Sequence, residues 1–115
     1  MDSEALLELA KEALEDLKAV NIQVLDVKSL TDVTDYMVIA TGNSGRQVKA
    51  LADNVALKAK RAGHPALGVE GEREGDWVLV DLTDIVIHVM QPDVRDLYQL
   101  EKLWSARAPT SAAAT

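Results

Sequence analysis

The chain has 115 residues, the size of one domain, and its 19 acidic and 12 basic residues give a formal net charge of −7. This acidity opposes general binding to nucleic acid or to an anionic membrane, because both attract positive charge. The absence of cysteine excludes disulfides, cysteine-ligated zinc, iron–sulfur clusters and a thiol nucleophile.

The N-terminal part predicts one helix followed by two strands. Apolar residues at three-to-four spacing predict a helix over residues 2–20, with Asp2 or Ser3 as its cap. β-Branched residues predict a strand at 22–28, and an apolar run predicts a strand buried on both faces at 36–41. The short connection between these strands favours an antiparallel pair.

The middle of the chain predicts a helix with clear ends. Ser44 and Gln47 form a capping box, and the helix that follows runs to about residue 62. Gly63 suits the position just after a helix. A third strand is expected at 67–70.

The C-terminal part predicts two strands and a last helix. Strands are expected at 77–81 and 85–90, and a helix at about 93–104. The order α-β-β-α-β-β-β-α predicts an α/β (α+β mixed) fold, with a mixed sheet of about five strands covered by helices. We expect one domain over 1–105 and a disordered tail at 106–115.

Charge is distributed unevenly along the chain. Residues 1–20 carry a net −4, residues 44–62 a net +4 and residues 70–96 a net −6. The first residues are acidic, unlike a signal peptide, and no apolar run approaches the roughly 18 residues of a membrane span. We therefore expect a cytoplasmic protein that does not bind membranes.

Two patterns carry an alternative, chemical interpretation. The turn 42–46, between a strand and a helix, could hold a phosphate, but we favour a capped helix entry. Asp32 with Asp35, and Asp81 with Asp84, could bind a divalent ion, but aspartate is common in turns and we favour solvated turn acids.

The histidines and aromatic residues are few. His64 and His88 are too isolated for a metal triad, and we interpret His88 as a satisfied histidine on a strand. Trp77 and Tyr98 lie among acidic residues, which favours a partner surface, because tryptophan and tyrosine are enriched at interface hot spots. For Trp104, core packing and a partner contact are equally favoured.

Three segments, 35–48, 75–84 and 87–104, resemble the signature of the ribosomal silencing factor family, also called Iojap-like proteins. The resemblance runs from residue 3 to about 105. It implies a nucleotidyltransferase-like fold, no enzymatic activity, no cofactor and no metal. It also implies binding to the large ribosomal subunit through the fourteenth large-subunit ribosomal protein, which blocks joining of the small subunit and represses translation under nutrient limitation. A role in large-subunit maturation and homodimer formation are further implications.

An acidic face with aromatic anchors suits a basic ribosomal protein and is repelled by bare RNA, so we expect at most peripheral contact with rRNA. Our hypothesis assigns desolvated contacts to Trp77, Tyr98 and apolar neighbours, and orientation and charge matching to nearby acids. The predicted partner-binding residues are Trp77, Asp81, Leu82, Asp84, Tyr98, Leu100, Glu101 and Trp104. The alternatives are a nucleotidyltransferase-like enzyme and a different interaction module, such as an assembly chaperone.

Overall fold

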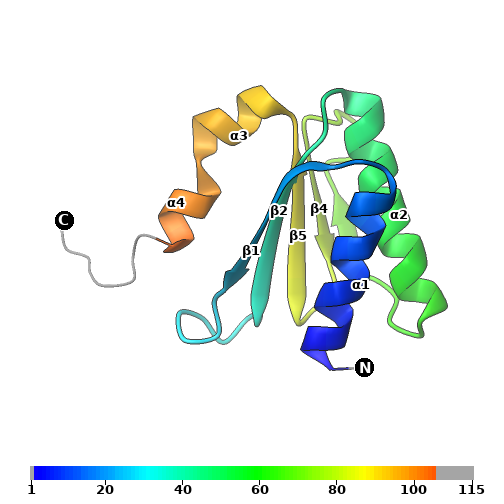
Figure 1. The fold of residues 1–115 in the computed structure, drawn as a ribbon, viewed down its shortest axis with the longest axis vertical. Coiled ribbons are helices and arrows are strands. Elements are labelled where there is room, and N and C mark those ends of the chain that lie inside the picture. Colours follow the sequence, from blue (N-terminus) through cyan, green and yellow to red (C-terminus); the bar gives the residue numbers. More distant parts are fainter. Residues whose placement is uncertain (1, 106–115) are drawn as a thin grey trace.

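The computed structural model describes residues 2–105, except the side chains of Trp104 and Ser105. It contains a mixed five-stranded sheet of order β1-β2-β5-β4-β3, with helices on both faces (Figure 1). This confirms the predicted mixed fold and its strands. In chain order the elements are α1 (Ser3–Asp16), β1 (Val20–Asp26), β2 (Tyr36–Thr41), α2 (Gly45–Arg61), β3 (Gly68–Glu70), β4 (Trp77–Asp81), β5 (Ile85–Met90), α3 (Pro92–Tyr98) and α4 (Leu100–Ser105). The predicted tail at 106–115 lies outside the described residues.

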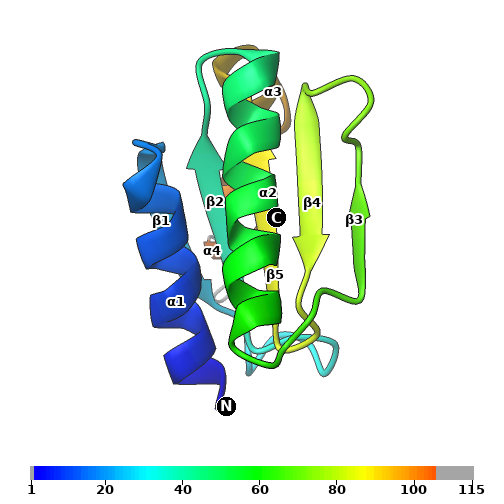
Figure 2. The ribbon, with the colours of Figure 1, turned by 90° about the vertical axis from the view of Figure 1, so that its right-hand side faces the viewer.

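Helices α1 and α2 lie side by side and cover one face of the sheet (Figure 2). The first begins where Asp2 Oδ1 accepts a hydrogen bond of 2.7 Å from the Ala5 N–H, so Asp2 is the cap. The second begins at Ser44, whose hydroxyl accepts from the Gln47 N–H at 3.1 Å, which confirms the predicted cap. Their apolar stripes and one side of the sheet form the larger core, which includes Leu6, Leu14, Val38, Leu51, Val55, Val80 and Ile87.

Strands β2 and β5 run parallel at the centre of the sheet, and the other neighbouring strands pair antiparallel. Every residue of β2 is buried, which confirms the prediction of a strand covered on both faces. The predicted antiparallel pairing of β1 with β2 is also confirmed. β2 therefore has an apolar face on each side, one below α1 and α2 and the other below the C-terminal helices.

The C-terminal helices lie on the opposite face of the sheet, over β1 and β2 (Figure 1). A smaller core lies beneath them, and its buried residues are Leu25, Val27, Met37, Ile39 and Met90. Leu30, Trp77, Val94 and Leu100 pack at its margin. Since α3 and α4 are short, no helix within residues 2–105 lies above much of the face formed by β4 and β5 (Figure 1).

The prediction of one helix at 93–104 is wrong. Gln99 takes the left-handed conformation, with φ 49° and ψ 49°, and ends α3. A second helix, α4, then starts in a new direction, which brings Glu101 within reach of Arg95. The first predicted helix also extends too far, because α1 ends at Asp16 and residue Lys18 turns the chain with φ 63°.

No helix within residues 2–105 is long and apolar enough to span a membrane.

Candidate partner-binding face

The sheet surface that α3 and α4 leave uncovered is formed mainly by β4 and β5. Strand alternation directs Val78, Val80 and Ile87 to the larger core, so their neighbours in sequence point to the other side. We call the resulting surface, with the adjoining end of α3, the contact face. Its residues are Trp77, Leu79, Asp81, Val86, His88 and Tyr98.

An aromatic cluster forms the centre of the contact face. The ring centroids of Trp77 and Tyr98 are 4.9 Å apart, and the planes are tilted by 50°. Tyr98 comes from α3 and is 55% exposed, whereas Trp77 comes from β4 and is half-buried. The fold thus brings together two predicted partner-binding residues that are 21 residues apart in sequence.

Below the tryptophan lies His88, which is buried on β5. The Trp77 Nε1–H donates to His88 Nδ1 at 2.9 Å. Burial lowers the pKa of His88 from 6.5 to about 4, so the ring is neutral at pH 7. The interpretation of His88 as a satisfied histidine on a strand is confirmed.

Two predicted acids lie at the far end of β4 and β5. Asp81 is four residues beyond Trp77 on the same strand, about 13 Å along it. Its Oδ1 accepts from the Thr83 N–H at 2.8 Å and stabilises the turn into β5. Asp84 is half-buried in the same turn, and its carbonyl oxygen accepts from the Asp35 N–H at 2.8 Å. The turn positions of both acids agree with our preference for turn acids.

Leu82 does not belong to this surface. Its side chain is 0% exposed and packs in the larger core below α1 and α2. The prediction that it contacts a partner is corrected by this burial, because the turn between β4 and β5 points the side chain inward.

The remaining predicted residues belong to α4. Leu100 packs at the margin of the smaller core, and Trp104 lies in the helix with its side chain outside the described part of the structure. Glu101 Oε2 accepts from Arg95 Nε at 3.0 Å. Burial raises the pKa of Glu101, but its backbone hydrogen bond and Arg95 outweigh burial, so the pKa lies below its usual value. This carboxylate therefore has an internal role.

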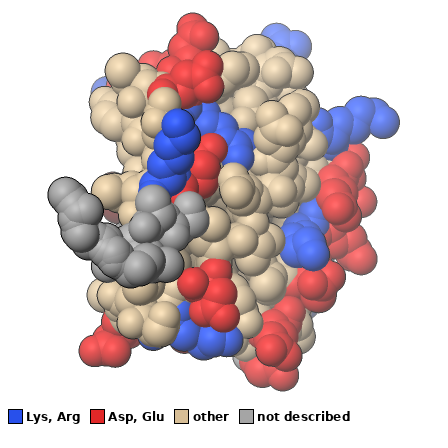
Figure 3. All heavy atoms as spheres, turned by 60° about the vertical axis from the view of Figure 1, so that its left-hand side comes forward, with Lys and Arg blue, Asp and Glu red and all other residues tan. Residues whose placement is uncertain are grey.

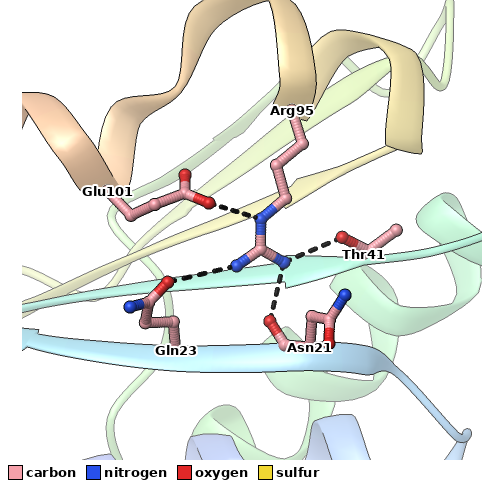
Figure 4. A network of polar contacts seen from close by, with 5 residues as sticks. All are labelled: Asn21, Gln23, Thr41, Arg95 and Glu101. Carbon is pink, nitrogen blue, oxygen red and sulfur yellow. Dashed lines mark hydrogen bonds and ion pairs between the residues drawn. The ribbon is translucent and has the colours of Figure 1, made fainter.

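Arg95 ties the C-terminal helices to the sheet (Figure 4). Its Nη1 donates to the Asn21 carbonyl oxygen at 2.6 Å and to Thr41 Oγ1 at 2.8 Å, while Nη2 donates to Gln23 Oε1 at 3.4 Å. The side chain lies beside a hollow of about 570 Å³ between β1, the end of β2, α3 and α4. Because the guanidinium donates to four groups of the protein, its evident role is to join these elements.

Figure 3 shows the side of the molecule on which α3 and α4 lie. Most of this surface carries neither basic nor acidic residues, and charged groups gather in a small cluster and along the margins. Uncharged surface bordered by charge is the usual composition of a protein interface.

The turn after β2 has a structural explanation. A Cβ on Gly42 would lie 2.9 Å from Val48 Cγ2 and 3.0 Å from the Val48 nitrogen, so only glycine fits there. Asn43 N–H donates to Gln47 Oε1 at 2.7 Å and completes the capped helix entry that we favoured. Within residues 2–105, no group of three His, Asp or Glu side chains could hold a metal ion.

Several residues on or near the contact face were missed by the sequence analysis. Leu79 and Val86 lie half-buried on the sheet, and Leu97 is 74% exposed on α3. The alternation that begins at Trp77 could have indicated Leu79. Arg95 carries no such signal, because three of its four partners come from β1 and β2, more than fifty residues away in sequence.

The comparisons with known proteins agree with this architecture. The family model described as "Ribosomal silencing factor during starvation" matches residues 1–114. The ribosomal silencing factor RsfS of Chromobacterium violaceum is 49% identical over 112 residues, covering 97% of this chain and 92% of that protein. RsfS of Haemophilus influenzae is 46% identical, covering 88% and 99% of the two chains. A crystal structure of a Chromobacterium violaceum protein superposes with a TM-score of 0.90 at 47% identity, covering 100% of this chain and 97% of that one.

Proposed function

The chain belongs to the ribosomal silencing factor family, and from this membership we propose that it binds the large ribosomal subunit through the fourteenth large-subunit ribosomal protein. The general role of the family is that of a ribosome-associated factor that regulates translation. In the proposed mechanism the bound protein occupies the intersubunit surface and blocks the small subunit, which represses translation under nutrient limitation. Inhibition of this kind requires only that the bound protein occupies the intersubunit surface, so no catalytic step is needed. A factor that acts on ribosomes in this way would work in the cytoplasm.

The observation that carries this proposal is the uncovered aromatic cluster on the contact face. Trp77 and Tyr98 combine a large apolar area with polar edges, which is typical of anchors that become desolvated in an interface. Asp81 points to the same side of the sheet as Trp77, and Asp84 lies in the turn that follows, so both could match basic groups of a ribosomal protein. Negative charge at this margin opposes contact with the phosphates of rRNA.

A tryptophan variant tests the proposed contact face. Trp77→Ala should weaken binding to purified bacterial large subunits by at least about 1–2 kcal/mol, because a hot-spot side chain is removed. Co-sedimentation with the subunits measures the affinity, and circular dichroism should stay native. The matched control is Leu57→Ala, because Leu57 is an exposed apolar residue (44%) on α2, on the other side of the sheet.

The blocking mechanism has its own readout. When purified small and large subunits are mixed, the native protein should reduce the yield of joined ribosomes in a sucrose gradient. Trp77→Ala should reduce the yield only at a concentration that is higher in proportion to its loss of affinity for the large subunit. Binding without reduced joining would contradict the blocking mechanism and would favour a role in subunit maturation.

A further inference from the structure

The hydrogen bond between Trp77 and His88 connects the main aromatic residue of the contact face to the sheet below it. In the pairing of β4 with β5, Trp77 lies opposite Met90, and His88 is two residues away on the same face. The two rings therefore form a diagonal pair, with centroids 5.8 Å apart and a tilt of 53°. The bond of 2.9 Å joins neighbouring strands through their side chains.

The chemistry of the two groups determines where the histidine proton lies. An indole N–H can only donate, so His88 Nδ1 must accept, and a neutral imidazole then carries its proton on Nε2. Burial holds the pKa of His88 at about 4 and keeps the ring neutral. The acceptor is therefore available throughout the neutral pH range.

The indole is restrained from a second side by Tyr98. Its ring centroid lies 4.9 Å from that of Trp77, and it belongs to α3 rather than to the sheet. A ring that is fixed before binding loses less conformational freedom when it meets a partner than a ring that rotates. Orientation of Trp77 in the free protein thus contributes to affinity.

We propose that His88 is a positioning residue of the contact face, whose Nδ1 holds the Trp77 indole in the orientation that packs on Tyr98 and meets the partner. The inference rests on the proposed function and deepens it. Contact with the partner is assigned to Trp77 and Tyr98, while His88 acts through Trp77.

Nitrogen NMR of the unmodified protein tests the geometry without any substitution. Long-range proton–nitrogen correlations at pH 7 should show His88 Nε2 protonated and Nδ1 unprotonated. Substituting His88 by Leu should shift the Trp77 indole N–H resonance. The opposite tautomer, with the proton on Nδ1, would overturn the proposal, because two donors cannot share that bond.

A double-mutant cycle tests the effect on binding. His88→Leu removes the acceptor, and Trp77→Phe removes the donor while keeping an aromatic ring. His88→Leu should weaken binding to purified bacterial large subunits roughly fivefold. The double variant should bind within twofold of Trp77→Phe alone, because the two residues act through one bond. Independent losses that multiply in the double variant would overturn the proposal.

A conservative substitution separates positioning from packing. The amide oxygen of His88→Gln can accept the indole N–H, so this variant should recover most of the affinity that His88→Leu loses. Equal losses in both variants would contradict positioning through the bond. Circular dichroism verifies that each variant folds.

The outcomes distinguish this inference from the proposed function. If Trp77→Ala weakens binding and His88→Leu binds like the native protein, only the role of His88 fails. If Trp77→Ala also binds like the native protein, the contact face and the inference that depends on it both fail.

Discussion

At the scale of single residues, His88 couples the stability of the fold to pH. Its pKa is lowered to about 4 in the folded protein against 6.5 in the unfolded chain, because burial disfavours the charged ring. Between these values the unfolded chain binds the proton more readily, so acid favours unfolding. The contribution of His88 is fully present above pH 6.5, declines as pH falls, and is lost near pH 4.

We expect the free energy of unfolding to fall by about 2 kcal/mol from pH 7 to pH 5 through this one group. Urea titrations at the two pH values measure it. In His88→Leu the proton-binding site is absent, so the fall should be smaller by that amount. An identical pH dependence in both proteins would contradict the assignment of the lowered pKa.

At the scale of elements, the C-terminal helices depend on Arg95. Arg95→Met should lower the free energy of unfolding by roughly 2 kcal/mol, less than for a completely buried pair because Glu101 is partly exposed to solvent. Amide hydrogen exchange should show the largest loss of protection in α3, α4 and β1, which the guanidinium joins. The exposed neighbour Asp96 provides the control Asp96→Asn, which should leave exchange unchanged. Equal loss of protection in α1 and α2 would argue against a local tie.

The C-terminal helices also show which parts of the structure the sequence could predict and which it could not. Local signals predicted the strand at residues 36–41 and the capped helix after Ser44 correctly, because alternation, apolar runs and caps act over a few residues. The break at Gln99 was missed, since glutamine carries no preference for the left-handed conformation. Burial of Leu82 and the internal ion pair of Glu101 were missed as well, because both depend on distant segments.

At the scale of the whole molecule, the sheet separates two surfaces of different character. The contact face lies on one side, and the basic residues of α2 lie on the other. The double variant Lys60→Gln, Arg61→Gln changes only the α2 side, so it should bind large subunits within twofold of the native protein. Asp81→Asn changes the contact face, so it should lower the rate of association with the subunits and make that rate depend less on salt. Stopped-flow measurements at two salt concentrations test both. A tenfold loss in the α2 variant would place that helix against rRNA.

The strand order also sets a time at which the sheet can form. Among the strands within residues 2–105, β5 comes last along the chain, yet it lies between the β1–β2 pair and the β3–β4 pair and joins them. A nascent chain that stops before residue 85 has two separate two-stranded pieces, each of marginal stability. Pairing of β2 with β5 must also close a long intervening segment, which slows folding. The sheet can therefore close only after β5 has been synthesised, so the contact face, which β4 and β5 form together, is absent from any shorter nascent chain.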